Sequence, residues 1–72
     1  MTVTGDQLRK VLAANIRRTA EKRQLALNHL ADRAMVSRSQ LYDVLAGNKA
    51  PSIDWIAKIS EPLGVEPWEL LR

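Results

Sequence analysis

Side chains that can donate and accept hydrogen bonds gather in one short segment of the chain, from Ser37 to Leu45. Within it, Leu41, Val44 and Leu45 recur at helical spacing and predict one apolar face. The side chains left for the opposite face are Arg38, Ser39, Gln40, Tyr42 and Asp43. Guanidinium, hydroxyl, amide and carboxylate groups are suited to hydrogen bonding, so we expect this helix to contact a partner outside the protein.

The start of this helix carries a predicted capping box. The Ser37 hydroxyl can accept from the backbone N–H of Gln40, and the Gln40 side chain can accept from the N–H of Ser37. Val36 and Leu41 are placed as the hydrophobic staple that accompanies such a start. Two uses of Gln40 therefore remain open, the cap and a contact with the partner.

A second short helical pattern immediately precedes this one. It runs from Leu27 to Ala34 with Leu30 and Ala31 on its apolar face, and three residues separate it from the next helix. Two helices this close cross steeply over a shared core, and Ala31 is small enough to let them approach. The second helix is then raised on one edge of the domain, with the width needed to enter the major groove of DNA. The first lies across the DNA backbone, with its N-terminus available to a phosphate.

Capping residues predict a longer helix before this pair. Thr4 and Gln7 repeat the capping box, and Val3 and Leu8 repeat the staple, so the helix is expected to begin at Thr4. Its apolar face is expected to comprise Leu8, Val11, Leu12, Ile16 and Ala20.

Two more helices are predicted after the pair. Gly47 is suited to a left-handed C-cap, and Ser52 caps the next helix. That helix should stop or kink near Ser60, because Pro62 lacks an N–H and crowds the preceding turn. The side chains expected to face inward are Ile53, Ile56, Ala57 and Ile59. Pro67 suits the first position of a last short helix, which brings the expected total to five.

Charge is distributed unevenly along the chain. Residues 1–49 carry a net charge of +5, whereas residues 50–72 carry −2. The positive charge coincides with the pair of short helices. The positive charge of residues 1–49 is suited to binding a polyanion such as nucleic acid. The negative charge of residues 50–72 argues against non-specific binding to every anionic molecule.

Length and composition exclude several classes of protein. With 72 residues and no cysteine, the chain predicts one domain with a helical core and no disulfide. No catalytic constellation, metal cluster or glycine-rich phosphate loop is present, and the lone His29 is expected at the surface, so we expect neither an enzyme nor a cofactor. No apolar run predicts a membrane span or a signal peptide, and a cytoplasmic protein is expected.

The order of these motifs resembles a known family of DNA-binding domains. The segments VSRSQL, LAGNKAPS and LGVEPWELL are similar to those of the lambda-repressor-like, Xre/Cro-type helix-turn-helix family over residues 8–71. The resemblance implies a compact all-α, five-helix domain spanning residues 1–72, with the helix-turn-helix unit at residues 27–46. It puts the structural positions of that unit at Ala31, Val36, Leu41 and Val44.

The same resemblance implies roles for the polar residues. Base edges are expected to be contacted by Arg38, Ser39, Gln40 and Asp43. Arg38 could read guanine through two hydrogen bonds, or contact a phosphate or water instead; Asp43 could accept from cytosine, or repel wrong sequences. The candidates for phosphate contacts are Arg17, Arg18, Asn28, Tyr42, Asn48 and Lys49, with packing at the rim as the alternative for Tyr42.

Four positions depart from the family pattern. Met35 stands in the turn where such domains usually have glycine, and a left-handed conformation there would cost about 1 kcal/mol. Leu27 stands where a polar residue usually begins the first helix of the unit, so that side chain is not expected to clamp a phosphate. Ala20 and Leu45 stand where many relatives pair an arginine with a glutamate, and an apolar contact is expected to replace the ion pair.

The expected function is that of a prokaryotic or phage repressor that binds double-stranded DNA at a specific sequence, and so associates with the nucleoid. One such unit buries too little DNA to be selective, which predicts a homodimer on a palindrome with half-sites about 34 Å apart. Trp68 and Leu71 are candidates for the dimer contact, although Trp55 and Trp68 could equally belong to the core. No small-molecule ligand is evident.

Two alternatives remain open. The first is an antitoxin or a restriction-system controller of the same fold, regulated by a dedicated protein partner. The second is a different class, a small helical module whose basic face docks an acidic protein. Substituting Arg38 and Gln40 would change the DNA sequence that is bound only if the helix reads bases.

Overall fold

The computed structural model describes residues 2–72 as helices joined by short turns. In chain order the elements are α1 (Gly5–Lys22), α2 (Leu27–Ala34), α3 (Arg38–Leu45), α4 (Ile53–Leu63) and the 3-10 helix η1 (Pro67–Leu71). The all-α class is confirmed, but the expected fifth helix is not an α-helix. It spans only five residues, and the Glu69 N–H bonds the carbonyl of Glu66, three residues back, at 2.9 Å.

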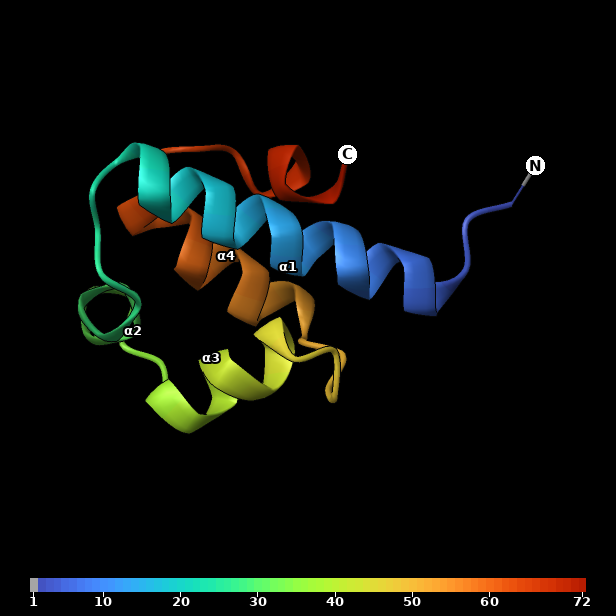
Figure 1. Ribbon diagram of the computed structural model, residues 1–72, viewed down its shortest axis with the longest axis horizontal. Helices are drawn as coiled ribbons and strands as arrows, with labels where there is room; N and C mark the ends of the chain where they lie inside the picture. Colours follow the sequence, from blue (N-terminus) through green and yellow to red (C-terminus); the bar gives the residue numbers. More distant parts are fainter. Residues whose placement is uncertain (1) are drawn as a thin grey trace.

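The long helix α1 is the element on which the others pack. It contacts α2, α3, α4 and η1, while α2 also packs on α3 and on α4. Figure 1 shows α2 and α3 below α1 and η1 above it. The pair of short helices is therefore carried at one edge of the domain, away from the C-terminal segment.

One apolar core joins all five elements. Its most deeply buried side chains are Leu12, Ile16, Leu30, Leu41, Val44, Ile59, Leu63 and Leu70. Burying each such side chain contributes about 1.5–3 kcal/mol relative to leaving it in water. Because every element supplies at least one of them, the pair of short helices depends on the rest of the domain for its position.

Most of the expected helix ends are confirmed. At the start of α1 the Gln7 N–H donates to the Thr4 hydroxyl at 3.1 Å, and the Thr4 N–H donates to the Gln7 side chain at 2.9 Å. The Trp55 N–H donates to the Ser52 hydroxyl at 3.0 Å at the start of α4. The staple before α1 does not remove its side chains from water, since Val3 is 62% exposed and Leu8 38%.

The expected stop near Ser60 is wrong. Helix α4 continues through Pro62 to Leu63 and ends at Gly64, which has the left-handed φ of 71°. The N–H groups of Gly64 and Val65 bond the carbonyls of Glu61 and Ser60 at 3.0 and 3.2 Å, which closes the helix end. Proline costs one helical hydrogen bond here, in the last turn, and the complete burial of Leu63 outweighs that loss.

The face of α4 that packs on the core also differs from the expectation. Ile53 is 84% exposed and Ala57 is exposed, although both were expected to face inward. Trp55 is buried instead, with Ile56 and Ile59. An arc centred on these three residues leaves positions 53 and 57, which are four residues apart, together on the outer side of the helix.

Candidate nucleic-acid interface

The turn between α2 and α3 adopts the strained conformation that its position demands. Met35 has φ 58° and ψ 41°, in the left-handed region, and its side chain is 85% exposed. The Val36 N–H bonds the carbonyl of Ala31 at 3.0 Å and the Met35 N–H bonds that of Asp32 at 3.2 Å. These bonds end α2 and turn the chain sharply into α3.

Small and branched apolar side chains set the separation of the two helices. Ala31 and Leu41 are fully buried, Val44 is 1% exposed, and Val36 is half-buried against the same core. Ala20 and Leu45, where an apolar contact was expected to replace an ion pair, are both buried in this core. A direct contact between Ala20 and Leu45 stays a prediction, because the two residues line different hollows beside α1.

The start of α3 presents its polar side chains to solvent. Arg38, Ser39 and Gln40 are exposed, and Asp43, one turn further, is half-buried. The Ser37 hydroxyl accepts from the Gln40 N–H at 3.2 Å, but no return bond from the Gln40 side chain is found within residues 2–72. Only half of the expected capping box is formed, which leaves the Gln40 amide available to a partner.

Arg38 is held by an acidic residue of the preceding helix. Its Nε and Nη2 donate to the Oδ1 and Oδ2 atoms of Asp32 at 3.2 and 2.8 Å. Both side chains are more than half exposed. The hydrogen bond from Arg38 lowers the pKa of Asp32, and the same bond raises the pKa of Arg38, so both groups are charged at neutral pH.

A second hydrogen bond joins the exposed sides of the two helices. The Tyr42 hydroxyl on α3 donates to Oδ1 of Asn28 on α2 at 2.6 Å. Asn28 lies in the first turn of α2, whose N-cap residue Ala26 supplies no side-chain hydrogen bond. The first backbone N–H groups of α2 thus have no capping side chain and can bind an anion.

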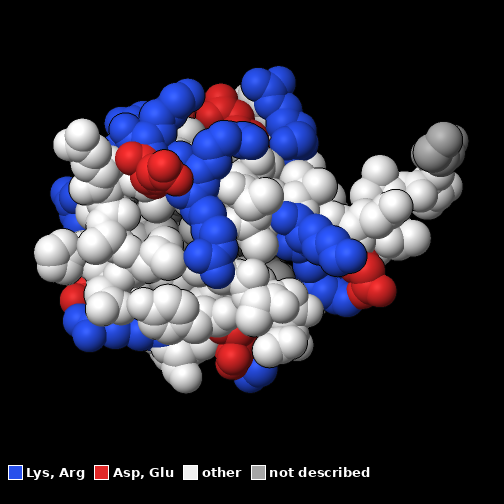
Figure 2. Space-filling model, in the orientation of Figure 1, with Lys and Arg blue, Asp and Glu red and all other residues white. Residues whose placement is uncertain are grey.

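Three of the basic or amide candidates for phosphate contacts lie near this pair. Arg17 borders one hollow lined by Ala26 and Leu27 and another lined by Leu45, so it lies between the start of α2 and the end of α3. Asn48 and Lys49 are exposed in the loop that follows α3. Figure 2 shows Lys and Arg side chains spread over α1 on the viewed face.

Arg18 lies elsewhere. Its guanidinium donates to Oδ1 of Asn15, whose Nδ2 donates to the carbonyls of Leu70 and Arg72 at 2.8 and 3.0 Å. Arg18 is thus part of a network on the η1 side of α1, and the structure does not bring it together with α3.

The roles of two residues in these networks were not predicted from the sequence. Asn15 is 4% exposed, and its polar side chain among the apolar residues of α1 was an available signal. Asp32 was not predicted to pair with Arg38. An acid in the basic half of the chain, six residues before Arg38, could have suggested the pair.

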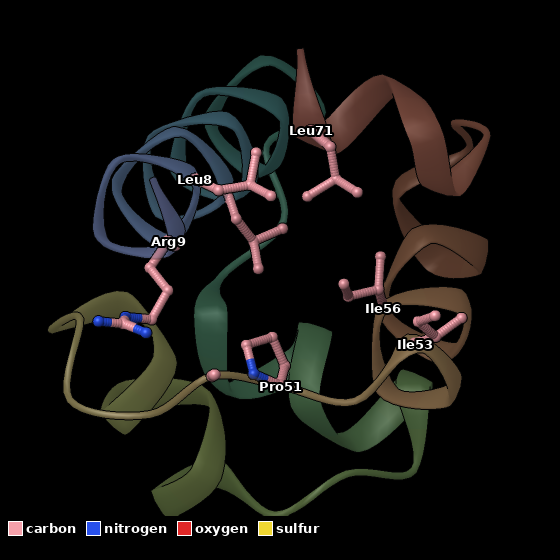
Figure 3. Close-up of a pocket in the computed structure, with 9 residues that line it drawn as sticks. Leu8, Arg9, Pro51, Ile53, Ile56 and Leu71 are labelled. Carbon is pink, nitrogen blue, oxygen red and sulfur yellow. The ribbon is translucent and has the colours of Figure 1, made fainter. Parts of the chain in front are cut away.

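The candidates for a dimer contact lie on the far side of α1. Trp68 is 57% exposed, and the Cζ atom of Arg72 lies 5.2 Å from the centre of its ring, whereas Trp55 is buried in the core. Leu71 is half-buried at an apolar hollow of about 260 Å³. Figure 3 shows Leu71, Leu8, Ile56, Ile53 and Pro51 around it.

The part of the chain that is described contains no cluster of acidic, histidine or cysteine side chains that could hold a metal. Within the same residues, no helix has both the length and the apolar content to span a bilayer. Two short helices, a left-handed turn between them and an exposed polar start of the second helix define a helix-turn-helix domain, a class that binds DNA.

The HTH_3 helix-turn-helix family model matches residues 16–70, so the chain belongs to this Xre-type, lambda-repressor-like family. Its members are DNA-binding transcriptional regulators and not enzymes. No curated protein matches the sequence.

Three solved structures show the same fold. A hypothetical transcription factor from Neisseria is 25% identical with a TM-score of 0.87, and the match covers 100% of this chain and 83% of that one. The clp gene regulator ClgR from Corynebacterium glutamicum is 28% identical with a TM-score of 0.81, over 89% of this chain and 68% of that one. An HTH_3 family transcriptional regulator from Vibrio cholerae is 22% identical with a TM-score of 0.86, over 93% of this chain and 38% of that one.

Proposed function

We propose that this protein is a repressor that binds a palindromic operator as a homodimer, with the start of α3 of each copy in the major groove. The observation that carries the proposal is the exposed polar start of α3 above its buried apolar face. Arg38, Ser39 and Gln40 reach base edges, with Asp43 one turn on. Repression follows from occupying the operator, which excludes other proteins from the same DNA.

Phosphate contacts on both sides of the groove fix the register of α3. The open N-terminus of α2 with Asn28 and Tyr42 anchors one DNA strand, and Asn48 and Lys49 after α3 anchor the other. Arg17 adds positive charge beside both anchors. Arg18 contributes least, because its guanidinium is hydrogen-bonded to Asn15.

Dimerisation supplies the selectivity that one helix cannot. Trp68 and Leu71 are proposed as contacts between the two copies, together with the apolar hollow at Leu8 and the exposed Ile53. Two copies related by a two-fold axis place their α3 helices one DNA turn apart, about 34 Å.

Selection of binding sites from random duplexes, followed by sizing of the complex, tests the proposal. We expect a palindrome bound by two copies, and a changed consensus for Arg38→Ala and for Gln40→Ala. If each copy neutralises about three phosphates, log K should fall with log salt at a slope near −5. Because each of the two copies loses one contact, Lys49→Ala should reduce the magnitude of that slope by about 2, whereas substitution of the exposed Lys58 of α4 by alanine should leave it unchanged.

Failure to enrich any sequence would contradict the proposal. A salt slope near zero on the selected duplex would contradict it as well. Binding to an acidic protein, with no DNA bound, would favour the interaction module instead.

A further inference from the structure

The ion pair between Arg38 and Asp32 leaves a specific part of the guanidinium free. A guanidinium has five N–H bonds, one on Nε and two on each Nη. Asp32 takes the Nε–H and the Nη2–H that lies parallel to it. The remaining parallel pair, one N–H on Nη1 and one on Nη2, forms the tip of the side chain and has no partner among the residues described.

This free edge matches one base. Guanine presents two adjacent acceptors, O6 and N7, in the major groove, and a guanidinium edge with two parallel N–H bonds satisfies both. Thymine and cytosine have no such pair of acceptors, and adenine has a donor beside its N7. An arginine whose inner edge is occupied can therefore still read guanine with its outer edge.

We propose that Asp32 is a positioning residue that makes Arg38 read guanine. The inference rests on the proposed function, in which α3 lies in the major groove. Asp32 does not need to touch DNA for this role. Its two oxygens fix the plane and the direction of the guanidinium before DNA binds.

The physical gain has two parts. A free arginine side chain populates many rotamers and loses that freedom when it binds a base, whereas the bidentate pair orders the guanidinium in advance. The carboxylate also prevents an alternative contact. If Arg38 swung away to a phosphate, Asp32 would be left unpaired beside the negatively charged backbone, which is unfavourable on every sequence. Both effects increase the preference of Arg38 for guanine over the other bases, and neither increases the overall affinity of the protein for DNA.

The frame that holds the two residues is rigid. Asp32 lies in the last turns of α2 and Arg38 is the first residue of α3. Between them, the left-handed Met35 and the backbone bond from Val36 to Ala31 fix the turn. The spacing of the carboxylate and the guanidinium is therefore set by backbone geometry and by the buried contact of the two helices.

The test compares base preferences rather than affinity alone. The first step identifies the operator position that Arg38 reads. It is the position at which the Arg38→Ala variant no longer shows the base preference of the wild-type protein. At that position, wild-type protein should prefer guanine by about tenfold to a hundredfold. Asp32→Ala and Asp32→Asn should reduce the preference by about fivefold or more, and Asp32→Glu should retain part of it. Binding to unrelated DNA should be unchanged or tighter, because a negative charge is lost.

Glu61→Gln is the matched control, since it removes one exposed negative charge outside the helix-turn-helix unit and should leave the base preference unchanged. Asp32 is more than half exposed, so thermal midpoints should stay within about 4 °C of wild type. A full guanine preference in Asp32→Ala overturns the inference while leaving the proposed function intact. Selectively tighter operator binding in Asp32→Ala also overturns it, because Asp32 would then restrain Arg38. Loss of sequence selection by the wild-type protein would overturn both.

Discussion

The hydroxyl of Tyr42 donates to Oδ1 of Asn28 at 2.6 Å and so ties the exposed side of α3 to the first turn of α2. The Asn28 side chain is exposed, so its Nδ2 group is accessible as a donor. This donor lies beside the uncapped N–H groups that begin α2. We therefore expect the two side chains to act together in binding a phosphate at this helix start.

Tyr42→Phe tests this arrangement. Loss of the hydroxyl should weaken DNA binding by about threefold on all sequences, because an exposed hydrogen bond contributes roughly 0.5–1.5 kcal/mol. In an Asn28→Ala background the same substitution should have little further effect if Tyr42 acts through Asn28. A full additional loss in the double variant would show that the hydroxyl binds the phosphate itself. Titrations with selected and unrelated duplexes measure both effects.

Met35→Gly should stabilise the domain. A left-handed conformation costs a residue with a Cβ atom about 1–2 kcal/mol, and glycine avoids that cost but loses more entropy on folding. We therefore expect the free energy of unfolding to rise by about 0.5–1 kcal/mol in urea titrations. Met35→Ala is the control, because it keeps the strain and removes only a side chain that is 85% exposed. Equal stabilisation by alanine would contradict the strain at this turn.

Asn15→Ala should destabilise the domain by about 2 kcal/mol, because it leaves the carbonyls of Leu70 and Arg72 without their donor. Arg18→Ala removes only the outer contact of the same network and should cost less than about 0.5 kcal/mol. Urea unfolding of both variants measures the difference. Equal losses in the two variants would assign the stabilisation to Arg18 rather than to the buried amide.

Arg38→Ala should raise the pKa of Asp32 towards its ordinary value, because the hydrogen bond from Arg38 is the main cause that lowers it. When the pKa of a carboxyl is lower in the folded than in the unfolded state, its ionisation stabilises the fold at pH values above the unfolded-state pKa. That contribution is lost as the pH falls through the lowered pKa. NMR titration of the Asp32 carboxyl carbon measures the shift. Lys58→Ala should leave this titration unchanged, and an unchanged pKa in Arg38→Ala would contradict the pairing.

Local signals predicted the helix-turn-helix unit well. The bounds of α2, the cap at Ser37 and the left-handed Gly47 follow from residues close together in the chain, whereas only the family resemblance drew attention to the turn at Met35. Backbone geometry at these places depends on side chains at most five positions away, which a sequence displays directly.

Features that depend on distant contacts could not be predicted in the same way. Pro62 remains inside α4 because Leu63 is drawn into a core built by other helices. The outward position of Ile53 depends on which arc of α4 meets α1 and α2. The partners of Asn15 lie 55 and 57 residues away, so no spacing in the sequence indicates them. The assignment of individual side chains to DNA contacts stays a prediction, which the Arg38, Gln40 and Lys49 variants test.

The bonds between α1 and the C-terminal segment also constrain how the protein is made. Leu12 and Ile16 of α1 leave the ribosome early, but η1, which packs on α1 and carries the buried Leu70, is the last of the five elements to be synthesised. Until then a nascent chain exposes an apolar stripe on a basic helix, which is a typical target for chaperones. We therefore expect the domain to fold after, and not during, translation of its α1 to α4 segment, and the exposed polar start of α3 to be held in position only when η1 has docked.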